Sequence, residues 1–413
     1  MALTAASSNG VEIGYVSEGS SFGQTPGSPT YQLVRYTGES LNFNITNTTS
    51  NEIRADRMTA DTIQTSADVS GGVNIELSYG SYDTLLEAAL CSVTWSTPPS
   101  TISHNAATNN LTVAVAGSNY TITAASGTPF STFVGTVLVG DYIKMNGLTA
   151  PNDGYKWVKV AAAPTNTVLT VTGVTLTAGS TTTGTVSFKP SARIKNGTTQ
   201  RSFTFFKGLT DLAQPTNYPQ FFFPGCRINN LNLSFATGSI LTGSIDVMGL
   251  SASVATAASP TKTAQSTSTV LNAVGNISNI FIDDVASSAF FNKLDFNYTN
   301  AIRAQDAIGT LGHVGLALGK VGVTGNIDIY FSDTTLYAKY LAGTAFSLAF
   351  MVKDTNGTAD GNAYIITIPR VKFTSATVVA SGSDADVNIS AQWQALVDAT
   401  GTYMVRIDRI ATG

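Results

Sequence analysis

Apolar and polar residues alternate strictly in several stretches of the chain. In LNFNITN, which begins at Leu41, apolar side chains alternate with Asn and Thr. The same pattern fills VNIELS from Val73, LNLSF from Leu231, NIDIY from Asn326 and VNIS from Val387. Successive side chains of a strand point to opposite faces, so this period predicts β-strands with one core face and one wet face. The sequence therefore predicts an all-β protein.

These alternating stretches occur twice, in the same order. LNFNITN (41–47) returns as LDFNYTN (294–300), VNIELSYGSYDTLLEAAL (73–90) as GNIDIYFSDTTLYAKYL (325–341), and residues 221–250 are similar to 364–396. Self-similarity over this length and in fixed order indicates two tandem copies of one module. Each copy is expected to contain a strand, a long loop, a strand, a helix and three further strands.

One short helix is expected in each module. The alternation after Val73 changes to a helical pattern in DTLLEAAL, and the second copy changes in the same way at TTLYAKYL. Asp83 or Thr84 can cap the first helix. Glu87 stands three residues after Thr84, as a capping box requires.

One large insertion distinguishes the two copies. Residues 94–200 have no counterpart in the second copy, and they contain short alternating stretches separated by Gly, Pro and Asn, which predicts a small separate β-domain. The expected organisation is module 1 at 1–93 and 201–250, the inserted domain at 94–200, a solvated Ser/Thr/Ala-rich linker at 251–275 and module 2 at 276–413.

Charge is low overall and unevenly distributed. Charged residues make up 12% of the chain, against 43% apolar residues, and the charged share is about half the usual value. The insert holds six Lys or Arg and two Asp, which leaves 16 basic and 24 acidic residues elsewhere, so the net charges are +4 and −8. Low surface charge is expected where partners cover a surface, although a secreted β-protein has a similar composition.

Several function classes are disfavoured. A net charge of −4 argues against a protein that grips nucleic acid. Cys91 and Cys226 form no disulfide framework and no metal-ligand spacing. The start, MALTAASSNG, has no basic or apolar segment of a signal peptide, and no apolar run reaches membrane-spanning length. We therefore expect assembly in a cytoplasm and no membrane partner.

No enzymatic or cofactor site is expected. His104 and His313 have no Cys, Ser or carboxylate partner at motif spacing. GTLGHVGLALGKVGVTG (309–325) lacks the spacing of phosphate-binding loops. Asp283 and Asp284 would point to opposite faces of a strand, which disfavours a shared cation.

The wet faces of the predicted strands carry Asn, Ser and Asp with scarcely a cation. Affinity for nucleic acid comes mainly from Lys and Arg at phosphates. A lightly acidic surface without such side chains suits a wall that stays hydrated and does not hold a polyanion. The alternative is a face that is merely solvated.

The order of these features resembles that of the major tail tube proteins of long-tailed bacteriophages. The resemblance is carried by GYVSEGSSFGQTPGSPTYQLVRYTGESLNF (14–43), by VNIELSYGSYDTLLEAAL and by the duplication. It implies β-sandwich modules whose inner sheets join into a continuous ring barrel. Rings of six modules would stack into a tube through which the genome is delivered, and the insert would decorate the exterior.

The resemblance also implies partners and a location. These are further copies of the chain, a tape measure protein, tail terminator or tip proteins, and double-stranded DNA that passes without specific binding, all in the tail of a virion. If a ring contains six modules, three chains with two modules each would close it. The alternative is a ring of six chains, in which one module of each chain lines the pore and the other lies outside. A secreted adhesin or surface-layer protein, or another virion component such as a head–tail connector, remains the alternative function.

Two sets of residues are predicted from this reading. The loops 55–72 and 304–325 are longer than hairpins need, and long loops in compact domains are usually functional, so we expect them to contact the next ring. Candidate inter-ring residues are Arg57, Asp61, Asp68, His313 and Lys320. Candidate lumen-facing residues are Asn42, Asn44, Asn74, Glu76, Asn230, Asn232, Asp246, Asp295, Asn326, Asp328, Asp386 and Asn388.

Overall fold

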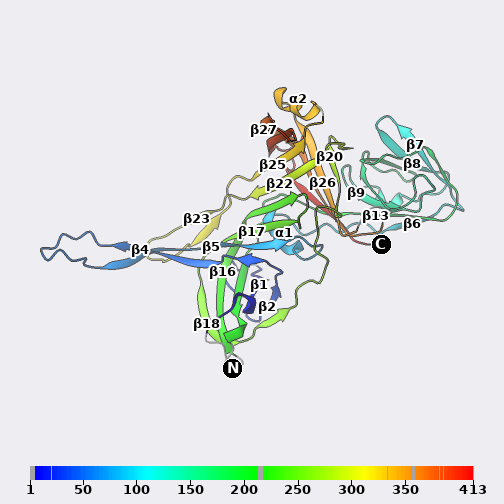
Figure 1. Ribbon diagram of the computed structural model, residues 1–413. Coiled ribbons are helices and arrows are strands. Elements are labelled where there is room, and N and C mark those ends of the chain that lie inside the picture. Colours follow the sequence, from blue (N-terminus) through cyan, green and yellow to red (C-terminus); the bar gives the residue numbers. More distant parts are fainter. Residues whose placement is uncertain are drawn as a thin grey trace.

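The structure is a computed structural model that describes residues 5–19, 21–212, 217–332, 334–355, 359–380, 382–384 and 386–412. The described chain is mostly β-strand and has two α-helices of seven residues each, α1 (Asp83–Ala89) and α2 (Thr335–Leu341). The prediction of an all-β fold with short helices is confirmed. Figure 1 shows a central body from which a long hairpin projects on one side and a smaller β-domain on the other.

One continuous antiparallel sheet, which we call the inner sheet, runs through the central body. Four strands come from the N-terminal part of the chain and four from the C-terminal part, and β16 pairs with β22 where the two parts meet. In order across the sheet the strands are β4 (Asn42–Thr49), β5 (Thr62–Glu76), β17 (Thr242–Gly249), the second half of β16 (Asn217–Ala236), β22 (Phe291–Thr299), β25 (Gly322–Tyr330), β28 (Asn388–Ala395) and the second half of β27 (Ala363–Val379).

Each part of the chain adds an outer sheet, and the two layers form a β-sandwich. We call the two parts the first unit and the second unit. The outer sheet of the first unit consists of β2 (Thr30–Leu33), β1 (Val11–Ser17), β15 (Phe203–Leu209), the first half of β16 and β18 (Ser253–Ala258). That of the second unit consists of β21 (Val285–Ala286), β20 (Ile277–Ile282), β26 (Phe346–Lys353), the first half of β27, β29 (Arg406–Ile410) and β14 (Ala192–Lys195).

Two long strands belong to both layers. The first half of β16 pairs with β15 and β18, and its second half pairs with β17 and β22. Its register with β17 shifts between Ile228 and Asn230, and the register of β27 with β28 shifts between Phe373 and Ser375. Such a bulge bends a strand and increases its twist, which lets each strand pass from the outer to the inner layer.

The apolar faces of the inner strands fill the space between the layers, as the alternation predicts. Leu231, Phe296 and Trp393 are at most 1% exposed and belong to one core that extends through both units. Burial of a side chain of this size contributes roughly 1.5–3 kcal/mol relative to exposure. The core therefore holds both units together as well as each unit internally.

Both helices end in the same way. The amide of Ser92 donates to the carbonyl of Glu87 after α1, and that of Thr344 donates to Lys339 after α2. Between them Cys91 and Gly343 have positive φ angles of 47° and 59°, which is the left-handed turn common after helices. The predicted capping box is wrong, because the N-cap residue is Tyr82 and it makes no side-chain cap bond.

The insert folds around its own core. An eight-stranded sheet is formed, with Phe130, Phe133 and Phe188 fully buried. Its strands are β6 (Ile102–Asn105), β7 (Leu111–Ala116), β8 (Asn119–Ala124), β9 (Tyr142–Asn146), β10 (Lys156–Val160), β11 (Val168–Thr172), β12 (Gly179–Thr181) and β13 (Thr185–Pro190). The next strand, β14, leaves this sheet and pairs with β29 of the second unit.

The stretch expected to be a solvated linker begins with strands. β18 pairs with β16, and β19 (Thr261–Thr263) pairs in parallel with β2. Lys262 forms an ion pair of 2.7 Å with Glu12 of β1. The first half of the stretch is therefore part of the first unit's outer layer.

Candidate functional surfaces

The polar face of the inner sheet collects the strand residues that were expected to face a lumen. Their side chains hydrogen-bond across strands. Asn230 Nδ2 donates to Asp246 Oδ2 at 3.3 Å, and Asn232 Nδ2 donates to Ser244 Oγ at 3.0 Å. Asn42 Nδ2 donates to Asn44 Oδ1 along β4 at 2.8 Å. The face is polar and hydrogen-bonded within itself.

The polar face continues across the junction of the two units. Ser234 of β16 donates to Asp295 of β22 at 2.7 Å, and Lys293 Nζ forms an ion pair of 2.7 Å with the same carboxylate. Further along the sheet, Ser390 Oγ donates to Asp328 Oδ1 at 2.5 Å. Lys293 is a cation on this face that the sequence reasoning missed, although its alternation with Asp295 placed it there.

Three other candidates lie near the ends of strands. Glu76 is the last residue of β5, and Asn388 is the first residue of β28. Asp386 is exposed and precedes β28. These positions lie at the margin of the polar face and not at its centre.

The two ends of the inner sheet are open edges in the described structure. β4 pairs only with β5, and the second half of β27 pairs only with β28. Apolar side chains are exposed at both edges: Ile45 on β4 is 40% exposed, and Val378 and Val379 on β27 are 38% and 55% exposed. An uncovered edge of this kind is a template for pairing with another strand.

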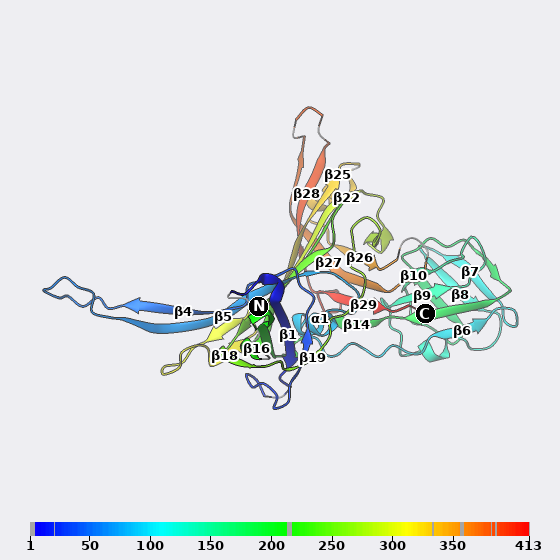
Figure 2. The ribbon, with the colours of Figure 1, turned by 60° about the horizontal axis from the view of Figure 1, so that its bottom comes forward.

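The end of β4 and the start of β5 form a two-stranded arm that projects from the body in Figures 1 and 2, and the loop between these strands is its tip. Its tip carries Ile53, which is fully exposed, and Met58, which is 67% exposed. Arg57 lies in the tip with a positive φ of 59°. Asp61 precedes β5 and accepts from the amide of Thr62 at 2.7 Å. The far end of the arm therefore exposes apolar side chains that no other described part of the chain covers.

The corresponding loop of the second unit is a smaller hairpin of β23 (Arg303–Gln305) and β24 (Gly315–Ala317). Its tip includes Ile308, which is fully exposed. Lys320 lies between this hairpin and β25. The two loops therefore share their place in the chain and differ in length and strand content.

His313 ties this hairpin to the first unit. Its Nε2 lies 2.9 Å from Oδ1 of Asp68 on β5, and its Nδ1 lies 2.6 Å from Oδ1 of Asp306 in the hairpin. Partial burial by itself lowers the pKa of His313, but the hydrogen bonds to both carboxylates outweigh burial and raise it above the ordinary value. Asp68 is thus a strand residue that binds within the chain.

The insert packs against the second unit, although it interrupts the first. Tyr142 and Trp157 of the insert form one apolar cluster with Met351, Ile365 and Ile410 of the second unit's outer sheet. Two ion pairs of 2.5 Å flank the cluster, Lys144 with Asp360 and Lys159 with Asp284. The basic insert therefore meets acidic side chains of the second unit.

A buried ionic group lies where β14 meets β29. Arg406 Nε donates to Asp408 at 2.7 Å and its Nη2 lies 2.8 Å from Asp141, which also binds Arg193. Ser191 donates to Asp408 at 2.7 Å. Burial by itself lowers the pKa of Arg406, but the two carboxylates raise it above the ordinary value, so the guanidinium stays charged.

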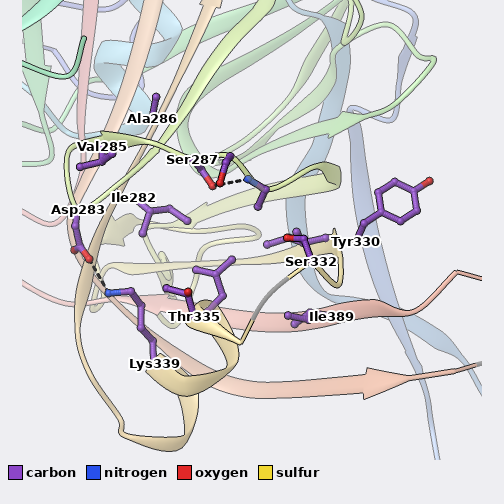
Figure 3. Close-up of a pocket in the computed structure, with 14 residues that line it drawn as sticks. Ile282, Asp283, Val285, Ala286, Ser287, Tyr330, Ser332, Thr335, Lys339 and Ile389 are labelled. Atoms are coloured by element: carbon purple, nitrogen blue, oxygen red, sulfur yellow. Dashed lines mark hydrogen bonds and ion pairs between the residues drawn. The ribbon is translucent and has the colours of Figure 1, made fainter. Parts of the chain in front are cut away.

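A cavity of about 350 Å³ lies between the β20–β21 hairpin and α2 (Figure 3). Ile282, Ile329, Leu336 and Ile389 give it apolar walls. Asp283 and Asp284 are the turn residues of this hairpin, both with positive φ. They were expected within a strand, but Asp283 binds Lys339 at 2.6 Å and Asp284 binds the insert.

The other residue types considered for chemistry have structural partners. His104 is buried and hydrogen-bonds to the carbonyl of Asn109 at 2.6 Å. Cys91 and Cys226 are free and buried, and burial raises the pKa of Cys91 to about 11. Among the described residues no group of three or more His, Cys, Asp or Glu is placed to hold a metal. Neither described helix is long and apolar enough to cross a membrane.

Comparison with known families decides the class of protein. The family model described as phage tail tube protein matches residues 8–395, which is nearly the whole chain. The chain belongs to the phage tail tube protein family. No curated protein matches it at a significant level. As a tail tube protein it is a structural component of the virion tail, and its family implies self-assembly into a tube.

Proposed function

We propose that this tail tube protein consists of two copies of one module and that three chains close a ring of six modules. Stacked rings would form the tail tube of a long-tailed phage and deliver its double-stranded DNA. The tape measure and the terminator or tip proteins would meet the same tube, and assembly would take place in the host cytoplasm.

One observation carries this proposal: the junction inside the chain is a strand pairing that both ends of the sheet are able to repeat. Within the chain, β16 accepts β22 at its edge. β27 is the counterpart of β16 in strand order, and β4 is the counterpart of β22. Pairing of β27 with β4 of the next chain would continue the sheet, and closure would remove both open edges.

The contact is head-to-tail, so closure depends on the rotation between units. Eight inner strands per chain would give a closed wall when three chains meet. The polar face of this wall would line the lumen, where Asn side chains and carboxylates offer phosphates no cation-rich surface. The arm and the β23–β24 hairpin would reach along the axis to the next ring.

Electron microscopy of the purified protein tests the proposal. Three whole chains per ring, with threefold symmetry in sequence and pseudo-sixfold symmetry in shape, are expected. Six whole chains per ring would overturn the trimer and favour one module outside the wall. A monomer that persists at high concentration would overturn the tube itself and favour a surface protein.

A further inference from the structure

The two helices occupy equivalent places in their units but differ in cover. Of the seven residues of α1, five are buried: Leu85, Leu86, Glu87, Ala88 and Ala89. In α2 only Leu336 is buried, and Leu341 at its C-terminal end is 70% exposed. Each helix packs on the long crossing strand of its own unit, α1 on β16 and α2 on β27. The difference therefore comes from what lies on the other side.

Residues of the second unit cover α1. The side chain of Asn300, which follows β22, donates to the carbonyl of Ala89 at 2.8 Å and to that of Ile228 at 2.9 Å. Tyr364 and Arg409 both bind Asp83 at the start of the helix. The end of β22, β27 and β29 thus close over α1 where the two units join.

Tyr298 is the apolar part of this cover. It pairs with Leu231 across the β16–β22 junction and is 1% exposed, two residues before Asn300, whose side chain binds the last residue of α1. In the repeated heptapeptide, LDFNYTN and LNFNITN, Ile45 stands where Tyr298 stands. Ile45 is 40% exposed on the open edge of β4.

The open surfaces of the chain match this arrangement. The counterparts of β22 and β29 in the first unit are β4 and β18, and in the described structure each is paired on one side only. In the second unit the edge of β27 is open, and the exposed helix α2 packs on this strand. The cavity of Figure 3 lies beside the helix.

We propose that α2 is a docking surface for the first unit of a second copy of this chain, with Ile45 of that copy packing on Leu341 and its β18 lying beside the start of the helix. This inference rests on the proposed ring. It goes further in assigning the contact to particular side chains outside the strand pairing. Two partly exposed apolar side chains would become buried together, which favours association.

Leu341→Glu tests the contact, because the residue is exposed in the single chain and its replacement leaves the core intact. The thermal unfolding of the monomer should stay unchanged. The concentration needed for ring formation should rise about tenfold or more, since burial of a carboxylate opposes association. Val115→Glu is the matched control, because Val115 is 62% exposed on β7 of the insert, away from α2. It should assemble as the wild type does.

Cross-linking gives a second readout that does not depend on folding of the Glu variant. The protein with both Ile45→Cys and Leu341→Cys is treated with a short bismaleimide, since both natural cysteines are buried. Linked chains are expected for the double variant, and neither single variant should yield them. If wild-type rings form, but Leu341→Glu assembles normally or the double variant gives no linked chains, the docking surface is wrong. Absence of rings in the wild type would instead overturn the proposed function.

Discussion

The outer sheets of the two units have related strand orders but different covers. In the first unit, Tyr31, Phe206 and Tyr218 form the outer cluster, and β19 of the same unit lies beside them. In the second unit, the insert supplies Tyr142 and Trp157 from a distant part of the chain. A segment that interrupts one unit has thus become part of the other, and the insert links the units in addition to the junction of β16 and β22.

Replacement of residues 97–190 by a short Gly/Ser linker should give the largest effect. The resemblance implied that the insert only decorates the exterior, and closing the remaining loop costs little. The structure changes this expectation, because replacement exposes Met351, Ile365 and Ile410. It also removes two lysines that form ion pairs with the second unit, Lys144 with Asp360 and Lys159 with Asp284. We expect aggregation or loss of cooperative unfolding, measured by calorimetry. Soluble protein that unfolds like the wild type would show that the second unit needs no cover.

Arg406→Met should lower stability by breaking the buried ionic group between the insert and β29. The substitution leaves the buried carboxylate of Asp408 without a guanidinium and leaves Asp141 with Arg193 alone. Removal of one partner of a buried ion pair costs about 3–5 kcal/mol. Urea unfolding measures the loss. Lys262→Met is the matched control, because its ion pair with Glu12 covers the first unit and is partly exposed, so about 1 kcal/mol or less is expected. Equal losses of unfolding free energy in both variants would show that the insert stabilises the second unit no more than Lys262 and Glu12 stabilise the first.

His313→Gln should have a smaller effect that depends on pH. The folded-state pKa of His313 is raised, so its contribution to stability is present below the unfolded pKa and is lost as pH rises through the folded pKa. The wild type should therefore lose stability relative to the variant between about pH 6 and pH 8. Hydrogen exchange of the β23–β24 hairpin measures this. A pH profile that is the same in both proteins would exclude the contact with Asp68 and Asp306 as its source.

Glu76→Lys combined with Asp328→Lys should have the smallest effect on stability, because neither side chain packs in the core. If the polar face lines the lumen, the added cations would contact phosphates, so tails of normal length should release DNA slowly and with a dependence on salt. Unchanged release at low and high salt would place both residues away from the lumen. Failure to form tubes would place them in an interface between chains.

Sequence patterns were sufficient for the strands and insufficient for contacts between distant segments. The period of two in LNFNITN and VNIELS placed their side chains on the correct face, because these inner-sheet strands have a core on one side only. The expected order of strand, loop, strand, helix and three strands matches β4 to β17 and β22 to β28 when the insert with β14 and the β23–β24 hairpin are set apart, but it did not include β1, β2, β18, β20 or β29. The pairing of Asp68 with His313 gave no signal, since the two residues are 245 positions apart and neither belongs to a motif.

The docking of the insert gave only a weak signal. The opposite net charges of the insert (+4) and of the remaining chain (−8) agree with this docking, but net charge does not identify partners such as Lys144 and Asp360. The capping box failed for a related reason. Asp83 is of a residue type that often caps helices, but its carboxylate binds Tyr364 and Arg409 of the other unit. Tertiary contacts therefore prevail over the local preference.

The passage of β16 and β27 through both layers has a mechanical consequence. β16 has 20 residues and β27 has 17, and each runs without interruption from the outer to the inner layer. A mechanical load on the outer layer is therefore transmitted to the inner layer along the backbone. Sliding of one layer over the other would require rupture of ladder hydrogen bonds on both sides of the bulge at once. Side-chain packing alone would resist such shear far less. A wall built from these units should therefore bend as a single thick plate, whose stiffness rises much faster with thickness than that of two loose sheets.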